Sequence, residues 1–309
     1  MMLPIPTDEL RAISRRSNGP GLRRLAVHLG SIAAAAAAVL AARATLWIWP
    51  AMVALGLLEV TLFAPHHEAT HETPFRSRWP MRLVGLVAGF LLLLPPKLFR
   101  AFHIAHHRYA QDPARDPELL GTMPLTRRLY AWRLTGIPYW IWNVRKLFAI
   151  AAGRADDPWI APEARGSIER EARGFLAAYA AIFAGAIALR SPLPLLLWVV
   201  PVVIAQPALR YLLLAEHTGC PLGADPWTNT RTTLASAPVR YLFWNMSYHA
   251  EHHLVPAVPF HALPALHAKV GKRFATVDPG YPAAHRGIRA AISRLATCAG
   301  AREDPSRCG

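Results

Sequence analysis

Residues 31–49 read SIAAAAAAVLAARATLWIW and form the centre of an apolar run from Leu25 to Trp49. At about 1.5 Å per residue, a helix over this run is long enough to cross a hydrocarbon core of about 30 Å. Arg43 interrupts the run, and we expect it to snorkel or to face other helices. Trp47 and Trp49 are typical of a membrane interface. The stretch predicts an integral membrane protein.

The composition agrees with this prediction. Of the 309 residues, 53% are hydrophobic and 17% are charged, whereas soluble domains carry about 25% charged residues. The mean hydropathy is +0.21. The net charge of +15 could suggest a nucleic-acid partner, but nucleic-acid binders rarely combine such charge with so much apolar sequence. We therefore expect a membrane partner and no nucleic acid, with the basic residues on one side of the bilayer.

Three further segments complete the predicted spans. Residues 51–64 become long enough if their helix continues through Pro65 into the histidines that follow. Residues 174–190 and 193–214 predict a second helical hairpin, and we expect the latter segment to kink at Pro201 and Pro207. The sequence thus predicts an all-α fold with about four transmembrane helices in two hairpins.

Orientation follows from the arginines before the first span, which place that end in the cytoplasm: Arg11, Arg15, Arg16, Arg23 and Arg24. Two crossings return the chain to the cytoplasm at His67, whereas a crossing at 81–98 would put His103 outside. If the histidine clusters form one site, residues 81–98 must be re-entrant or interfacial, as the double proline at 95–96 allows. The alternative is a true crossing without a common site.

The chain divides into a basic cytoplasmic segment at 1–24, a membrane domain at 25–270 and a basic C-terminal tail at 271–309. Within the domain, residues 123–168 alternate tryptophan and tyrosine with arginine and lysine. This pattern is typical of a helix on an anionic membrane surface. A cap packed on the site is the alternative, and we expect a histidine-lined helical cap on the cytoplasmic side.

Three histidine motifs carry the chemistry: His67-Glu-Ala-Thr-His71, His103-Ile-Ala-His106-His107 and His249-Ala-Glu-His252-His253. Helical residues at i, i+3 and i+4 share a face, so each motif should direct its imidazoles one way. Imidazole suits iron, zinc, copper or nickel. The motifs hold more donors than one metal can use, so two metals are expected. The single His217, just past the last span, should join them.

Other histidines and other classes of protein fit this pattern less well. His66 lies about 100° round a helix from His67, His28 falls within the first span, and His261 and His267 suit supporting or surface roles. A metal transporter would place its histidines near the midplane of the membrane. A zinc hydrolase normally needs three ligands and an open position.

In these motifs the sequence resembles the membrane fatty acid desaturase superfamily, which includes lipid hydroxylases and carotenoid oxygenases. The motifs occur in the order and at the separations of that family, and the similarity covers roughly residues 50–270. Residues 229–267 (NTRTTLASAPVRYLFWNMSYHAEHHLVPAVPFHALPALH) look especially like bacterial members linked to rhizopine or rhizobitoxine metabolism.

The resemblance implies an oxygen-dependent desaturase of a fatty acyl or similar lipid-like substrate, with a lipid or hydrocarbon hydroxylase or ketolase as the alternative. It implies a non-haem di-iron centre and an external electron donor of the ferredoxin or cytochrome b5 type. We expect a bacterial inner-membrane location with a cytoplasmic active site. By position, the resemblance assigns both metal binding and catalysis to His67, His71, His103, His106, His107, His217, His249, His252 and His253.

One position departs from the family pattern. Some acyl desaturases have an asparagine four residues before the isolated histidine, where this chain has Leu213. Glu216 could substitute through a water molecule. A ligating imidazole usually donates its second N–H to a carboxylate or carbonyl, and we expect Asp116 and Glu216 to support the ligands in this way. The alternative for such acidic residues is a salt bridge at the membrane interface.

Overall fold

The computed structural model describes residues 4–120, 122 and 125–301, and nearly all of their regular structure is helical. Two strands of two residues each, β1 (Thr232–Thr233) and β2 (Val277–Asp278), pair in parallel. Four stretches of helix are long and apolar enough to cross a membrane, as predicted: Thr7–Ala42, Ile48–Thr70, Pro162–Ala188 and Leu195–His217. The chain is therefore an α-helical integral membrane protein.

The first predicted span was placed too far along the chain. Helix α2 (Asn18–Ala42) ends before Trp47 and Trp49, and α3 (Ile48–Val60) begins after a tight turn. Thr45 holds this turn, because its Oγ1 donates to the Ala42 carbonyl at 3.0 Å and accepts from the Trp47 amide at 3.2 Å. Arg43 is exposed in the turn, so it needs neither to snorkel nor to face other helices.

The second span continues as predicted, from α3 through a short break into α4 (Phe63–Thr70), which contains Pro65. Helix α3 packs against both α2 and α10 (Val200–His217). Before α10 the chain makes a π-helical turn, η2 (Leu195–Val199). Pro201 and Pro207 follow in α10 and lack the amides of regular helical hydrogen bonds. The π turn lies where the sequence predicts an irregular helix.

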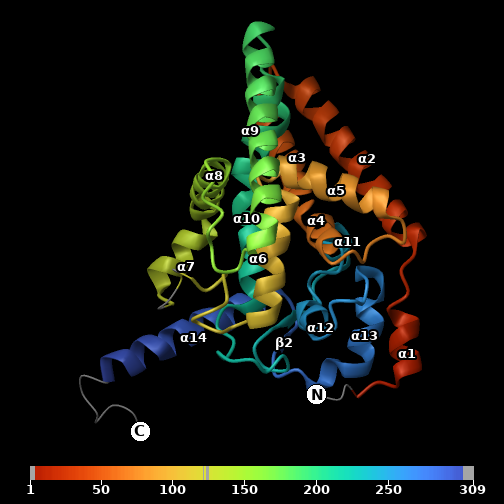
Figure 1. Ribbon diagram of the computed structural model, residues 1–309, viewed down its shortest axis with the longest axis vertical. Coiled ribbons are helices and arrows are strands. Elements are labelled where there is room, and N and C mark those ends of the chain that lie inside the picture. Colours follow the sequence, from red (N-terminus) through yellow and green to blue (C-terminus); the bar gives the residue numbers. More distant parts are fainter. Residues whose placement is uncertain (1–3, 121, 123–124, 302–309) are drawn as a thin grey trace.

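No straight helix covers residues 81–98. Helix α5 (Arg78–Leu91) and α6 (Pro96–Tyr109) meet at 95° across a four-residue break. Leu93 takes a left-handed conformation in the break, with φ of 55°. Pro96 begins α6 because proline is favoured in a first helical turn. The bend directs α6, which carries the second histidine motif, away from the axis of α5 (Figure 1).

The predicted insert forms α7 (Arg127–Leu134), α8 (Ile137–Ala151) and the turn η1 (Pro162–Ala164), with residues 123 and 124 outside the described part of the chain. Helix α8 packs on α9 (Arg165–Ala188). The remaining short elements are α1 (Thr7–Ile13), α11 (Ala237–Leu242), α12 (His249–Leu254), η3 (Phe260–Ala262), α13 (Leu263–Val270) and η4 (Gly271–Arg273).

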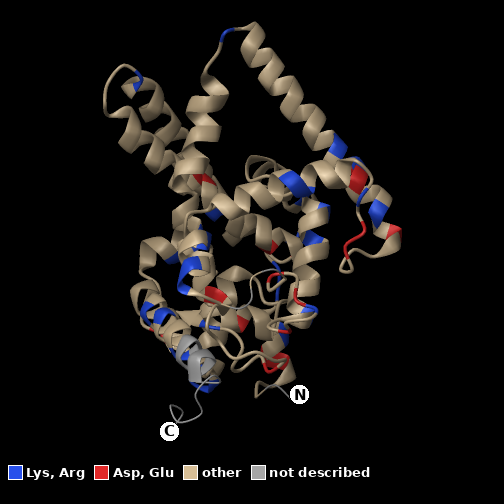
Figure 2. Ribbon diagram, turned by 90° about the vertical axis from the view of Figure 1, so that its left-hand side faces the viewer, with Lys and Arg blue, Asp and Glu red and all other residues tan. Residues whose placement is uncertain are grey.

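Helix α14 (Tyr281–Ala301) packs against α10 and α7, so the predicted tail contributes to the folded body. Together with α1, α12 and α13, it lies at the end of the molecule opposite the tips of α2 and α9 (Figure 1). Charged residues concentrate toward that same end (Figure 2). The apolar helices therefore form one part of the molecule, and the elements around α12 form a more polar part.

Candidate metal centre

All nine predicted histidines come together where α4, α6, α10 and α12 meet. They form two sets, and within each set the candidate donor atoms lie within 4.8 Å of one another. The five-histidine set contains His67, His71, His103, His107 and His252. The four-histidine set contains His106, His217, His249 and His253.

The four-histidine set converges on the Nε2 atom of His217. This atom lies 3.2 Å from Nε2 of His106, 3.0 Å from that of His249 and 3.1 Å from that of His253. One ring nitrogen can donate or accept only one such hydrogen bond, so three neighbours are not explained by hydrogen bonding. Nitrogen ligands about 2.1 Å from a tetrahedral metal are about 3.4 Å apart. The set therefore fits a transition-metal site.

The five-histidine set has the same character. His103 Nε2 lies 2.8 Å from that of His71 and 3.0 Å from that of His107, which lies 3.1 Å from Nε2 of His252. His67 completes the set, with its ring centroid 4.2 Å from that of His103. Both nitrogens of His67 are buried without a hydrogen-bond partner among the described residues. A metal ion would satisfy such a nitrogen.

The sequence predicted that each motif directs its imidazoles one way, but each of the two longer motifs divides its histidines between the two sets. His103 and His107 join the five-histidine set, whereas His106 joins the four-histidine set. In the last motif, His249 and His253 join the four-histidine set and His252 joins the other. Positions i+3 and i+4 lie about 100° apart round a helix, so one short helix serves two adjacent sites.

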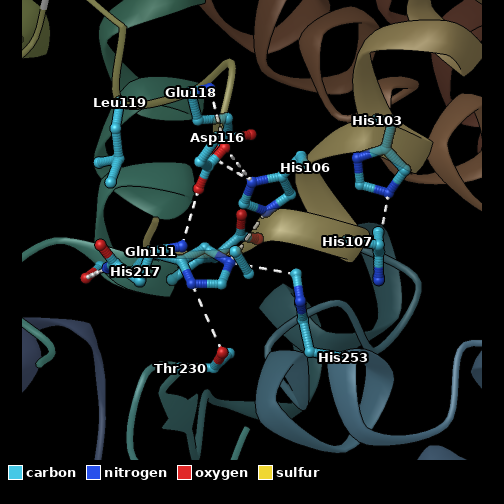
Figure 3. Close-up of polar contacts among 12 residues, drawn as sticks. His103, His106, His107, Gln111, Asp116, Glu118, Leu119, His217, Thr230 and His253 are labelled. Atoms are coloured by element: carbon cyan, nitrogen blue, oxygen red, sulfur yellow. Dashed lines mark hydrogen bonds and ion pairs between the residues drawn. The ribbon is translucent and has the colours of Figure 1, made fainter. Parts of the chain in front are cut away.

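Asp116 lies where the sequence predicted a supporting carboxylate. Its Oδ1 is 2.9 Å from Nδ1 of His106, on the side of the ring opposite the metal-facing nitrogen (Figure 3). The backbone amides of Gln111 and Glu118 also donate to Asp116, each at 2.9 Å. Burial alone raises the pKa of this carboxyl, but these hydrogen bonds and His106 lower the pKa below its ordinary value. The charged Asp116 fixes the His106 ring.

Glu216 also lies beside the four-histidine set, with Oε1 3.5 Å from Nδ1 of His249. Three further residues lie beside the ligands, and sequence reasoning missed two of them, Asn229 and Gln111. Glu68 Oε1 lies 3.9 Å from Nδ1 of His252, the Asn229 carbonyl lies 3.1 Å from Nδ1 of His217, and the Gln111 side chain donates to the His217 carbonyl at 2.6 Å. Glu68 has a sequence signal, since it lies inside the first motif, whereas Asn229 and Gln111 have none.

Four histidines expected to have other roles lie outside both sets. Nδ1 of His66 is 3.0 Å from the Gly85 carbonyl, and Nε2 of His28 is 2.8 Å from the Leu58 carbonyl. Nδ1 of His267 lies 2.5 Å from Oε1 of Glu251 in the last motif, and His261 lies in η3, after that motif. Each carbonyl-bonded ring therefore has a packing role, and His267 supports the helix that carries the last motif.

Burial favours the neutral imidazole that a metal requires. It is the largest cause that lowers the pKa of His249, His252 and His253 well below the ordinary histidine value, and neighbouring histidines add to it. These three rings are therefore neutral at pH 7, with a lone pair free for a metal.

A cavity of about 730 Å³ opens beside the centre. Its wall includes His106, His217 and His249 from the four-histidine set and His67 and His103 from the other. Helices α6, α7, α8 and α10, with the loops at 111–120 and 218–222, supply most of the remaining wall. Helices α7 and α8 of the predicted insert therefore form part of the cavity wall. The cavity has room for a lipid-sized molecule.

Comparisons with known proteins identify the family that this architecture resembles. The family model described as fatty acid desaturase matches residues 44–284, which contain all nine histidines. A dihydrorhizobitoxine desaturase of Bradyrhizobium elkanii is 27% identical over 261 residues, covering 76% of this chain and 70% of the relative. A sphingolipid delta(4)-desaturase of Drosophila melanogaster is 25% identical, covering 75% of this chain and 70% of the relative.

A third relative is an sn-1 oleoyl-lipid 12-desaturase of Picosynechococcus sp. (strain ATCC 27264 / PCC 7002 / PR-6), which is 25% identical. That alignment covers 71% of this chain and 54% of the relative. The family model covers well over half of the chain, and the paired histidine sets lie inside the matched region. The chain belongs to the fatty acid desaturase family.

Proposed function

We propose that this protein is an oxygen-dependent membrane desaturase that acts on a fatty acyl or similar lipid-like substrate through two irons held by its histidines. The observation that carries the proposal is the gathering of nine histidines into two adjacent sets beside one cavity. When bound, a pair of irons supplies the activation of dioxygen and the removal of hydrogen from an unactivated C–H bond.

The chain's own residues hold and orient these metals. The five-histidine and four-histidine sets supply the nitrogen donors, and no glutamate or aspartate belongs to either set. Asp116 orients His106, Glu68 and Glu216 face His252 and His249, and the Asn229 carbonyl faces His217. The hydrogen bonds to Asp116 and to the Asn229 carbonyl hold the rings of His106 and His217, as is usual for metal-ligating histidines.

The substrate is expected to enter the 730 Å³ cavity so that a carbon lies next to His106, His217 and His249. Apolar side chains such as Phe99, Leu98 and Leu213 would surround its chain. We further propose a bacterial inner-membrane location with the histidine centre on the cytoplasmic side, where a ferredoxin or cytochrome b5-type donor could deliver electrons.

Expression with a ferredoxin and its reductase tests the proposal. Profiling of lipids and small metabolites should reveal a product that has lost two hydrogens relative to its precursor. His106→Ala should abolish this product, whereas His261→Ala, outside both sets, should retain it. A product that gains one oxygen instead would establish the hydroxylase, and no histidine-dependent oxidation product would refute both activities.

A further inference from the structure

Three arginines and many apolar side chains line the cavity beside the histidines; Arg294 is exposed, whereas the other two are half-buried. Arg210 of α10 and Arg133 of α7 both line it, and α7 packs against α10. The two guanidinium groups are close enough to repel each other. Two half-buried positive charges facing one cavity are costly unless an anion lies between them.

The Arg210 side chain is held in place without a salt bridge to any described residue, although Glu118 and Glu216 are close enough to attract it. Its guanidinium carbon lies 4.7 Å from the ring centre of Tyr139, and the Tyr139 hydroxyl donates to the Leu92 carbonyl at 2.5 Å. The Arg210 Nε is buried and has no hydrogen-bond partner among the described residues. The cation–π contact orients the guanidinium and leaves its other N–H groups free for a ligand.

Three carboxylates line the cavity, Asp116, Glu118 and Glu216, and each faces a histidine. Glu118 is also close enough to attract both arginines. Glu216 Oε1 lies 3.5 Å from His249, and Glu118 Oε2 lies 3.9 Å from His106. In the part of the chain that the structure describes, neither Arg210 nor Arg133 forms a salt bridge within 4.0 Å. Among the described residues no carboxylate is thus at salt-bridge distance from either arginine, so both guanidinium groups can bind the oxygens of an anion.

The position of Arg210 gives a distance to the metal centre. Arg210 and His217 are seven residues apart on α10, so they lie on the same face, about 10 Å apart along the axis. Leu213 lies between them and lines the same cavity. An apolar side chain thus lies between Arg210 and His217, which suits a molecule with a charged head group and a short apolar portion.

We propose that Arg210 and Arg133 form a subsite for the anionic head group of the substrate, a carboxylate or a phosphate, and hold it about 10 Å from the histidine centre. The proposal rests on the desaturase function and narrows its substrate to an anionic amphiphile. Such a head group could belong to a free acid or to an anionic membrane lipid. Arginine suits either, because its planar fork binds two oxygens at once.

Equilibrium binding to the full-length protein in phosphatidylcholine nanodiscs tests the subsite. The probes are radiolabelled n-alkanoates from hexanoate to hexadecanoate, each paired with the alcohol of equal chain length. Arg210→Gln and Arg133→Gln should each weaken binding of the best alkanoate by about tenfold or more and leave binding of the matched alcohol unchanged. Arg128→Gln, exposed on the same α7 and outside the cavity wall, should leave both unchanged.

Competition by phosphatidylglycerol in the nanodisc identifies the source of the head group. Displacement of the alkanoate points to a membrane lipid, and its absence points to a free acid; either result upholds an arginine-dependent subsite. Absence of saturable alkanoate binding overturns the proposal. So does equal loss of alkanoate and alcohol binding in both arginine variants while metal content stays normal. The binding assay does not depend on turnover. If the protein shows arginine-dependent binding but no desaturase activity, the proposed function is refuted and the subsite is retained.

Discussion

His107 and His253 stack face to face, with ring centroids 4.0 Å apart and planes 8° from parallel, although they belong to different histidine sets. His107 comes from α6 and His253 from α12, so this contact joins the two longer motifs. The two sets consequently share a wall, and each metal would lie next to the other. That adjacency allows two metals to act on one substrate carbon.

Removal of a ring at this shared wall should stop oxidation. His107→Ala leaves a gap in the five-histidine set, and we expect product formation to fall by more than about a hundredfold, because even partners of metal ligands contribute 10–100-fold. Product profiling of membranes with equal amounts of inserted protein measures the effect. His261→Ala is the control, since His261 belongs to neither set. Retained activity in His107→Ala would remove His107 from the centre.

Asp116 should act through His106 rather than on the substrate. Asp116→Asn removes the charge that fixes His106 Nδ1 and should lower metal affinity or activity about 10–100-fold. Asp112→Asn is a matched control, because Asp112 forms a salt bridge with the exposed Arg115, and exposed pairs contribute little. Metal titration of the purified variants provides the comparison. Equal affinities in the two variants would show that Asp116 does not support the ligand.

Packing between the spans should depend on Gly56 of α3. A Cβ added at Gly56 would overlap the Pro201 carbonyl of α10, whereas one added at Gly30 of α2 has nothing within 4 Å. Gly56→Ala should destabilise the protein by about 1–3 kcal/mol through overpacking. Gly30→Ala should be neutral or stabilising, because alanine is the better helix former. Thermal unfolding in detergent separates the two, and an unchanged Tm for Gly56→Ala would contradict the close packing.

The helical content and the chemistry of the centre follow from local sequence signals. Apolar runs predict spans because the bilayer sets a minimum length, and the histidine motifs predict a metal centre because helical spacing brings imidazoles together. The end of the first helix was missed because its stop is a threonine-held turn at Thr45, without proline or glycine.

Helical spacing accounts for the separation of the i+3 histidine of each longer motif from its i and i+4 histidines. Which histidines of α6 meet which histidines of α12 depends on how the two helices cross, and this tertiary relationship could not be predicted from spacing. The same holds for Asn229, which contributes through its backbone carbonyl and so carries no side-chain signal. The arginines of the cavity are distant in sequence and meet only because α7 packs on α10.

Metal removal should destabilise the protein. Without metal, each set is a group of buried imidazoles with no metal ion to bind. A metal that binds only the folded state therefore adds stability. Treatment with an iron chelator should lower Tm and make α12 more sensitive to protease, since this short helix supplies three of the nine histidines. Restoration of Tm by ferrous iron is the control. An unchanged Tm in fully stripped protein would argue against metal binding at both sets.

If the two histidine sets hold two irons, elemental analysis of protein purified from iron-replete cells measures them directly. We expect about two irons per chain, with fewer in His107→Ala and the same number in His261→Ala. Stoichiometric zinc with no iron, or a single metal per chain that His107→Ala does not affect, would contradict the di-iron centre.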